Sequence, residues 1–371
     1  MPLPIPAPDP IPLPAPVAWL KFLLIFTFIL HILAMNLALG GGAIAAVTHW
    51  RARTGGRLRH LRLAREISLR LPAAMALTIT LGVAPLLFAQ VLYGQFFYTS
   101  SILLGWVWLG LLGLLLLGYY GYYWYAFRFE QLGPAAAWVI TASVALLSLI
   151  PVIFTHNVTL MLQPERWQAL YTSGTHWNWA DPAVVPRFRH FLVASVAVAG
   201  LGVFLHGLAT RKRDADYAGW VMRSGATWFV AATLVQYGVG IWFLTRLPTH
   251  IMMLFLGASG AATLTFLAAL LLSLVAIILV VLACFARTPA LPALAGVGSL
   301  AGTVCLMAVM RDIVRDAYLA PYFRPDELAV APQWGVVAFF LLLLVAGLGV
   351  IAYMLSLFRP FARTGARAEA R

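Results

Sequence analysis

Histidine is the residue type in this sequence with the most scope for chemistry, because a neutral imidazole can bind a metal or exchange a proton near pH 7. Two of the eight histidines stand in apolar runs. His31 lies in Leu-His-Ile-Leu-Ala-Met-Asn-Leu-Ala-Leu-Gly without a charged neighbour, and His190 follows Arg187-Phe-Arg189. An ionisable group inside an apolar segment needs a partner and usually has a function. A haem iron is a suitable partner for both side chains.

Each of these histidines also has a simpler interpretation. His31 could hydrogen-bond to a neighbouring helix, and His190 could belong to an ordinary basic helix start at the lipid headgroups. Basic residues are scarce on that side of the chain, however, and Arg187 and Arg189 suit charge-assisted pairing with haem propionates. His60 and His176 are expected in loops, in contact with solvent.

A haem held by one histidine often takes a second ligand. Met252 and Met253, in His250-Ile-Met-Met, offer a thioether, which raises the potential of a haem relative to two histidines. Methionine also fills gaps in apolar cores, so this alternative stays open. Only two cysteines occur, Cys284 and Cys305, and Cys-x-x-Cys-His is absent. A covalently attached haem and a cysteine-held iron–sulfur cluster are therefore excluded.

Few other polar groups lie in apolar runs. Gln90 is one, and Arg311, Asp312, Arg315 and Asp316 end another run. These last four could pair among themselves at i,i+4 spacing. They could equally face haem propionates.

A stack of two haems, ligated by His31 and His49 on one helix and by His190 and His206 on another, is a further possibility. His31 and His49 would share a helix face about 27 Å apart. The stack needs each pair to match in depth. His31 is expected near mid-span and His190 at a span's outer edge, so we reject this arrangement.

The elements that position these residues must be membrane helices. The chain has 371 residues, of which 62% are hydrophobic and 10% are charged, whereas a soluble chain has about 25% charged residues. This excludes a soluble enzyme, a secreted disulfide scaffold and a nucleic-acid-binding protein, despite the net charge of +13. A spanning helix needs about 20 apolar residues. The sequence predicts nine, near 18–49, 69–93, 100–127, 135–158, 188–210, 219–245, 254–286, 290–314 and 333–358.

Most of the 25 Lys and Arg residues fall in alternate loops and at the C-terminus. The positive-inside rule therefore predicts an outer N-terminus and a cytoplasmic C-terminus. The expected organisation is a proline-rich outer segment (1–17), a nine-helix membrane domain (18–358) and a basic cytoplasmic tail (359–371). The proline-rich segment is either a disordered tail or a strap on a partner subunit.

The loops are expected to be short with three exceptions. The inner loop 51–68 is long and basic, and the outer loops 159–187 and 315–332 are long enough to have structure. Trp167, Trp177 and Trp179 lie in the first of these outer loops, where tryptophan usually anchors a protein at the membrane surface.

The sequence resembles subunit I of the cytochrome bd quinol oxidases along nearly its whole length. Four stretches carry the resemblance: His31 with its Asn-Leu-Ala-Leu-Gly; Leu81-Gly-Val-Ala with Tyr93-Gly-Gln-Phe-Phe-Tyr-Thr-Ser; Leu162-Gln-Pro; and Arg187-Phe-Arg-His190-Phe-Leu-Val-Ala-Ser. The resemblance implies an all-α integral membrane protein of nine helices, arranged as two four-helix groups plus a final helix. It implies that His31 ligates a haem of an active site, and that His190 and Met252 ligate a low-spin haem b. Arg311 resembles the arginine of a family motif that is otherwise absent.

The sequence also departs from that family. The long quinol-binding loop between spans six and seven is reduced to Arg246-Leu-Pro-Thr-His250. Span 100–127 has no acidic residue, and Gln90 stands where the family has a glutamate. The glutamate that ligates a second active-site haem is also missing, with Met307 or Gln90 as neutral substitutes. Oxygen reduction requires proton delivery, for which these spans offer no carboxylate path.

We therefore predict a b-type cytochrome subunit of a bacterial inner membrane. Its predicted cofactor is haem b, with a second, high-spin haem at His31, and its predicted cofactor contacts are Arg187, Arg189, Arg246, Arg311 and Gln90. Electrons would pass at the outer face to or from other membrane or periplasmic redox subunits, such as a c-type cytochrome. The alternative is a haem-free quinone-binding or anchor subunit. A transporter is disfavoured because the halves of the chain show no inverted repeat.

Overall fold

In the computed structural model, residues 5–55 and 58–368 are described, and almost all of them are helical. The longer helices are α1 (Val17–Gly55), α2 (Leu58–Ser68), α3 (Leu71–Leu104), α4 (Trp106–Phe127), α6 (Ala136–Met161), α8 (Val184–Thr210), α9 (Ala215–Thr245), α11 (Gly260–Phe285), α12 (Ala290–Leu319) and α13 (Trp334–Ala368). Short elements connect them: α5 (Phe129–Leu132), α7 (Trp167–Ser173), α10 (Thr249–Met253), 3-10 turns at Gly133–Ala135, Pro164–Arg166 and Pro325–Glu327, and a π-helical turn at Leu254–Ala258. Nine segments of the described chain are long and apolar enough to span a membrane, as expected.

The inner segment 51–68, expected as a loop, is helical wherever it is described. Helix α1 continues to Gly55, and α2 follows from Leu58. Helix α2 is amphipathic: Leu63, Ala64 and Ile67 are buried, while the arginines lie on the other face. The high arginine content hid this apolar face, so the expectation of a loop was wrong.

Further boundaries differ from the expected ones. Helix α3 continues to Leu104 rather than ending at 93, and α4 begins at Trp106 rather than at 100. The seventh span begins at Gly260 rather than at 254, because Gly257 has a φ of +119°, which ends the preceding helical turn. Helix α12 continues to Leu319, so the following loop is shorter than expected.

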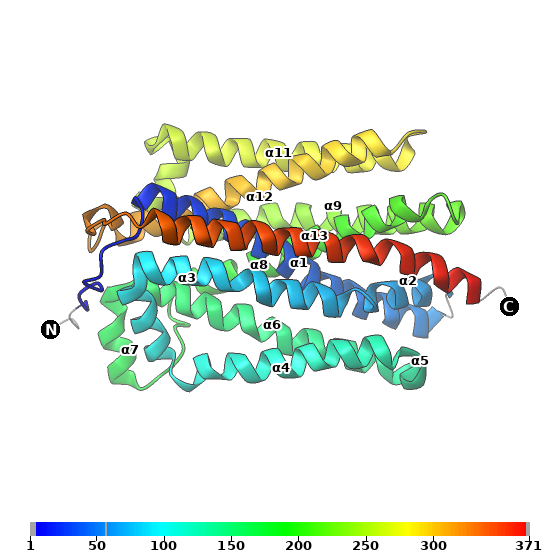
Figure 1. Ribbon diagram of the computed structural model, residues 1–371, viewed down its shortest axis with the longest axis horizontal. Coiled ribbons are helices and arrows are strands. Elements are labelled where there is room, and N and C mark those ends of the chain that lie inside the picture. Colours follow the sequence, from blue (N-terminus) through cyan, green and yellow to red (C-terminus); the bar gives the residue numbers. More distant parts are fainter. Residues whose placement is uncertain (1–4, 56–57, 369–371) are drawn as a thin grey trace. The chain divides into compact units, whose positions relative to one another are not determined.

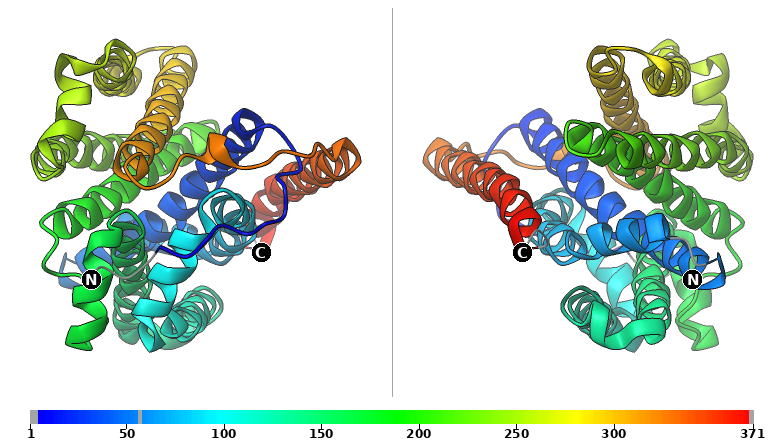
Figure 2. Two further views of the ribbon diagram at one scale, coloured as in Figure 1. Left: turned by 90° about the vertical axis from the view of Figure 1, so that its left-hand side faces the viewer. Right: turned by 90° about the vertical axis from the view of Figure 1, so that its right-hand side faces the viewer.

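The chain divides into two compact units, and each is described separately. The first contains Phe22–Arg324 and the second contains Pro10–Lys21 with Pro325–Arg371. Within the first unit, α8, α9, α11 and α12 enclose one apolar core. Helices α1, α2, α3, α4 and α6 form the other group and share a second core with α8 and α9. Figures 1 and 2 show α11 and α12 on one side of this unit and α4 on the other.

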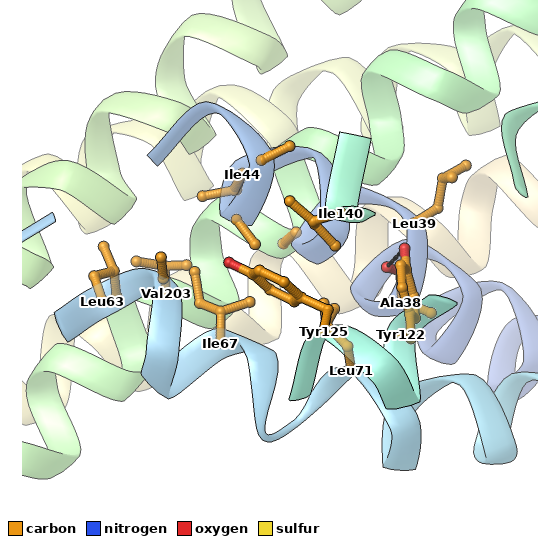
Figure 3. Close-up of a cluster of buried hydrophobic side chains, with 14 of the residues drawn as sticks. Ala38, Leu39, Ile44, Leu63, Ile67, Leu71, Tyr122, Tyr125, Ile140 and Val203 are labelled. Carbon is orange, nitrogen blue, oxygen red and sulfur yellow. Dashed lines mark hydrogen bonds between the residues drawn. The ribbon is translucent and has the colours of Figure 1, made fainter. Parts of the chain in front are cut away.

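The larger core is filled by aliphatic side chains around two tyrosines. Tyr122 and Tyr125 of α4 are fully buried beside Ile44, Leu71 and Ile140 (Figure 3). The hydroxyl of Tyr122 donates to the carbonyl of Ala38 over 2.9 Å. These side chains hold the helices together through close packing rather than by removal from water, because the alternative environment is lipid, and the hydroxyl bond fixes α4 against α1.

Glycines allow α8 and α9 to approach each other closely. A Cβ at Gly200 would lie 2.6 Å from the Phe229 nitrogen, and one at Gly225 would lie 2.2 Å from the Phe204 nitrogen. Small residues at helix crossings are typical of membrane proteins, where van der Waals packing holds helices together. This contact fixes the relation of α8, which carries His190, to α9.

In the second unit, the proline-rich segment pairs with the chain that leads into α13. Leu13 donates its N–H to Ala329 over 2.8 Å and accepts from Ala331 over 3.0 Å, and Gln333 donates to Pro14 over 2.8 Å. The two stretches run parallel at the Leu13–Val330 bridge. The sequence predicted either a disordered tail or a strap on a partner subunit, and it did not predict this pairing within the chain. The ends of the predicted outer segment and basic tail, 1–4 and 369–371, lie outside the described residues.

Candidate functional site

His31 is held in an orientation that leaves one ring nitrogen available. Its Nδ1 lies 3.0 Å from the carbonyl oxygen of Thr78 on α3. A carbonyl only accepts hydrogen bonds, so the neutral imidazole carries its proton on Nδ1 and a lone pair on Nε2. Nε2 has no hydrogen-bond partner among the described residues. Histidines that ligate metals commonly have this arrangement, with the second nitrogen donating to a backbone carbonyl.

Gly82 provides the space for the His31 ring. A Cβ at this position would lie 2.9 Å from both Cε1 and Nδ1 of His31. Any larger residue would displace the imidazole. Gly82 belongs to the Leu81-Gly-Val-Ala stretch, and it lies one turn after Thr78 on α3. The same stretch of α3 therefore accepts the hydrogen bond of the His31 ring, at Thr78, and leaves space for that ring, at Gly82.

His190 lies in the second turn of α8, against α9. Its Nδ1 is buried without a hydrogen-bond partner, and no partner is found for Nε2 in the described part of the chain. The ring packs near Gly240, and Gln236 of α9 donates to the His190 carbonyl over 3.1 Å. An imidazole used only for packing would be expected to satisfy its buried nitrogen, because leaving it unpaired costs about 1–3 kcal/mol.

The two arginines that precede His190 differ in their environments. Arg187 is buried, its Nε has no hydrogen bond, and its guanidinium lies 5.1 Å from the Phe243 ring centroid. Arg189 is exposed and lies 5.3 Å from the Trp242 ring centroid. Neither forms an ion pair with a carboxylate among the described residues. Arg187 is the better placed of the two for a buried anion.

A cluster of charged residues lies near these histidines. Arg311 stacks on Phe28, with 4.4 Å between Cζ and the ring centroid, and it is within electrostatic range of both His31 and Arg187. Arg315 forms an ion pair with Asp312. Arg311 therefore lies between His31 and Arg187 in electrostatic terms, and it forms no ion pair with a carboxylate among the described residues.

The pairing within α12 differs from the expected one. The residues at i,i+4 spacing have like charges, so the ion pair joins Asp312 and Arg315 at i,i+3. Asp316 instead accepts from the hydroxyl of Tyr93 over 2.9 Å. Tyr93, which is fully buried under the Arg315 guanidinium, was not singled out in the sequence. Its place in the Tyr-Gly-Gln-Phe stretch was the available signal.

Three of the predicted residues are not brought to these histidines. Met252 is half-buried in α10, and no contact described for it reaches His190. Gln90 accepts from the hydroxyl of Tyr98 over 3.2 Å on its own helix. Arg246 is exposed at the end of α9. The roles assigned to these three residues stay predictions.

Arg246 lines a pocket of about 430 Å³ at the end of the unit where α7 lies, which we call the α7 end (Figure 1). The wall also includes Glu165, Asp181, His250 and Tyr322. Tyr322 donates to Glu165 over 2.9 Å. Burial, together with this bond to an acid, raises the pKa of Tyr322. The pocket is a mixed polar site rather than a surface of one charge.

His156, which the sequence analysis did not consider, is fully buried in α6. Its Nδ1 accepts from the backbone N–H of Asn178 over 3.0 Å, and the rings of Trp177 and Trp179 pack around it. Because Nδ1 is an acceptor, the proton of the neutral ring is on Nε2. Nε2 is buried without a hydrogen-bond partner, as a nitrogen of His190 is, but its proton makes His156 a poor ligand. Its partners follow it by more than 20 residues, so no local signal identified it.

The remaining histidines have protein partners. His49 bonds to Tyr125 over 3.0 Å and His206 to Glu66 over 2.7 Å. His60 was expected in a loop, in contact with solvent, but it lies in a helix, so that expectation was wrong. His176 does lie in a loop, as expected, but it is half-buried. His60 lies in α2, half-buried against Trp220, and the Nδ1 of His176 bonds to the Leu103 carbonyl over 3.0 Å.

Of the three tryptophans in 159–187, Trp167 is not a surface anchor. It is fully buried, and its indole N–H donates to Leu160 over 2.8 Å. Trp179 remains 57% exposed, as an anchor requires.

The residues present fit a haem. One imidazole with a free Nε2, another with an unbonded buried nitrogen, and a buried and a half-buried arginine that form no ion pair are the groups that iron and propionates require. No group of three or more His, Cys, Asp or Glu side chains that could hold a bare metal ion occurs among the described residues.

Comparison with known proteins identifies the fold. No protein-family model matches the sequence, and no curated protein matches it either. A chain of the bd oxidase from Geobacillus thermodenitrificans has a similar structure, with a TM-score of 0.74 and 12% sequence identity; the match covers 95% of this chain and all of that one. The nine-helix architecture described above is therefore the fold of a cytochrome bd oxidase subunit, in a distantly related sequence.

Proposed function

We propose that this chain is a haem-carrying electron-transfer subunit of a membrane respiratory complex. The observation that carries the proposal is the state of two histidines: His31 keeps Nε2 free while Nδ1 is bonded to Thr78, and His190 has a buried nitrogen without a partner. The likeness in fold to a chain of a bd oxidase supports the same function.

In this proposal His190 holds a low-spin haem b, with Met252 as its second ligand, and His31 holds a second, high-spin haem. Bound haem supplies one-electron transfer, with a potential set by its ligands and surroundings. The buried Arg187 and the half-buried Arg311 are the cations for propionates, and the exposed Arg189 contributes at longer range. Gln90 and Arg246 are lesser candidates for cofactor contacts.

The proposed setting is the inner membrane of a bacterium, with the N-terminus and the α7 end outside. Electrons pass at that face to or from another membrane or periplasmic redox subunit. A c-type cytochrome, rather than a quinol, is our candidate partner. Only four residues, 247–250, separate Arg246 from Ile251 at the junction of α9 and α10. This junction leaves no room for a long quinol-binding loop.

The test is a reduced-minus-oxidised absorption spectrum of the purified protein, with pyridine haemochrome quantitation of haem b per chain. We expect more than one haem b per chain. A single haem per chain would mean that only one of the two proposed sites, at His31 or at His190, binds haem. A protein expressed with ample haem supply that contains none would instead support a haem-free anchor or quinone-binding subunit.

We expect no appreciable oxidation of quinol by oxygen. The reason is the short α9–α10 junction, together with the absence of acidic residues from α4. Oxygen uptake with a quinol as the sole electron donor measures this directly. Sustained uptake would contradict this part of the proposal while leaving the haem assignments intact.

A further inference from the structure

A pocket of about 440 Å³ lies at the opposite end of the same unit, where α2 lies (the α2 end; Figure 1). Arg51 from the last turns of α1 and His60 from α2 contribute to its wall. The rest of the wall comes from α9: Trp220, Arg223, Ser224, Thr227, Trp228 and Ala231. This pocket has no part in the proposed haem sites.

The α9 residues of the pocket form one helix face. Trp220, Ser224, Thr227, Trp228 and Ala231 are spaced three or four residues apart, or at sums of these steps. Such residues lie one above another along a helix. The face therefore carries two indoles, of Trp220 and Trp228, with the hydroxyls of Ser224 and Thr227 between them.

Arg51 and Arg223 bring positive charge to the pocket. No acidic residue lines it, and neither guanidinium pairs with a carboxylate in the described part of the chain. Three other arginines at this end do have such partners: Arg59 bonds to Asp216, Arg62 to Asp214 and Glu66, and Arg65 to Glu130. The acids of the α2 end are thus engaged elsewhere, and the pocket is left cationic.

Ring contacts hold some side chains of the pocket in place, and other side chains have polar groups without a partner. Trp220 stacks on Tyr217 and meets the His60 ring at 4.9 Å, and the Arg51 guanidinium lies 5.8 Å from the Trp228 centroid. The Ser224 hydroxyl makes no hydrogen bond among the described residues. Two guanidiniums and a free hydroxyl therefore line one pocket. They offer hydrogen-bond donors, and no carboxylate in the pocket accepts from them.

We propose that this pocket binds a phosphate ester through Arg51, Arg223 and Ser224. Arginine guanidiniums bind phosphate oxygens in paired hydrogen bonds, and a hydroxyl supplies a further donor. A carboxylate-free pocket accepts a phosphate without like-charge repulsion.

The position of the pocket favours the headgroup of an anionic phospholipid over a soluble phosphate. Arg223 lies eight residues after the start of α9, about 12 Å along the helix axis. Tryptophan at this level of a spanning helix is typical of the border between headgroups and acyl chains, and Trp220 lies within one turn of Arg223 on α9. Basic residues just inside a membrane surface attract anionic lipids.

The experiment is native mass spectrometry of the full-length protein released from nanodiscs of phosphatidylcholine with a minority of phosphatidylglycerol. The Arg51→Gln/Arg223→Gln variant removes the two pocket cations. The Arg128→Gln/Arg211→Gln variant is the control, because it removes two cations from the same end outside the pocket. Thermal stability in lipid-depleted detergent, with and without inorganic phosphate, tests whether the pocket binds a soluble phosphate instead of a lipid headgroup.

We expect wild type and control to retain phosphatidylglycerol and the pocket variant to lose it by roughly tenfold or more. Stabilisation by inorganic phosphate that depends on Arg51 and Arg223, without lipid retention, would support the site and assign it to a soluble phosphate. Equal retention by all three proteins, with no such stabilisation, would overturn the proposal. Haem content should be the same in all three, so failure of this inference is distinct from failure of the proposed function.

Discussion

The histidines of α1 and α8 have different partners at the two ends of the first unit. Helix α1 carries His31 and His49, and α8 carries His190 and His206, so each helix has one histidine toward each end. At the α2 end, His49 and His206 bond to the side chains of Tyr125 and Glu66. Toward the α7 end, His31 bonds only to a backbone carbonyl, and the His190 ring has no hydrogen bond among the described residues. On these two helices, the histidines without a side-chain partner are the ones proposed to bind another molecule.

Two arginines toward the α7 end differ from Arg62 at the α2 end. Arg62 lies between Glu66 and Asp214. Arg187 and Arg311 have aromatic neighbours and form no ion pair with a carboxylate among the described residues, although Asp181 is within electrostatic range of Arg187. A buried charge without a partner is costly. Such a cost is expected where a bound anion, here a propionate, supplies the missing charge.

The largest effect is expected from His190→Ala. If the nitrogen of this ring binds iron, its removal abolishes the sharp α-band of a reduced low-spin haem while the protein still inserts into the membrane. His206→Ala on the same helix is the matched control and should keep the band, since its partner is Glu66. An unchanged spectrum for His190→Ala would remove the assignment.

A loss of one haem is expected from His31→Ala, with the low-spin signal spared. Haem quantitation per chain measures this, and His49→Ala on α1 is the control. Gly82→Ala gives a finer test, because its Cβ would press on the His31 ring without removing a ligand. We expect it to perturb the spectrum of the same haem. If His31→Ala leaves the haem count at the wild-type value, this histidine serves only in packing.

A smaller effect is expected at the arginines. Removing a cation near a propionate favours the oxidised, more positive iron and so lowers the midpoint potential. Because Arg187 is buried and Arg189 is exposed, Arg187→Gln should lower the potential by several tens of mV, about 59 mV for each tenfold change in a one-electron equilibrium. Arg189→Gln should lower it less. A redox titration that gives the reverse order would place Arg187 away from the haem.

The smallest effect is expected at Asp214, which caps α9 by accepting the N–H of Tyr217 over 3.1 Å. Its hydrogen bond from Arg62 lowers the pKa of this carboxyl. A lowered pKa means that the carboxylate stabilises the fold above the ordinary value of about 3.9, and that this stabilisation is lost as pH falls through the folded-state value. Asp214→Ala should therefore melt slightly earlier than wild type near pH 7, with the difference shrinking in acid. A difference that is constant with pH would assign the effect to helix propensity.

The spans and the candidate histidines could be predicted from the sequence, because both depend on local contrast between apolar and polar residues. Helix α2 could not, since its arginines mask a face made only of Leu63, Ala64 and Ile67. The bond from His31 to Thr78 and the packing of His156 on Trp179 join residues far apart in sequence. Such contacts follow from helix packing rather than from spacing. Whether Met252 reaches a haem depends on the same kind of contact.

The pairing of Leu13 with Val330 has a consequence for how the chain is made. In the described part of the chain, every candidate span except the last lies between these two residues, which is eight crossings. An even number returns the chain to the face of the membrane from which it started, so the hydrogen bonds around Leu13 cannot form when a single crossing has been skipped. The proline-rich segment, which precedes α12 in the chain, must also wait for its partner until α12 has been inserted. Completion of this pairing thus reports that an even number of crossings was made between the two segments.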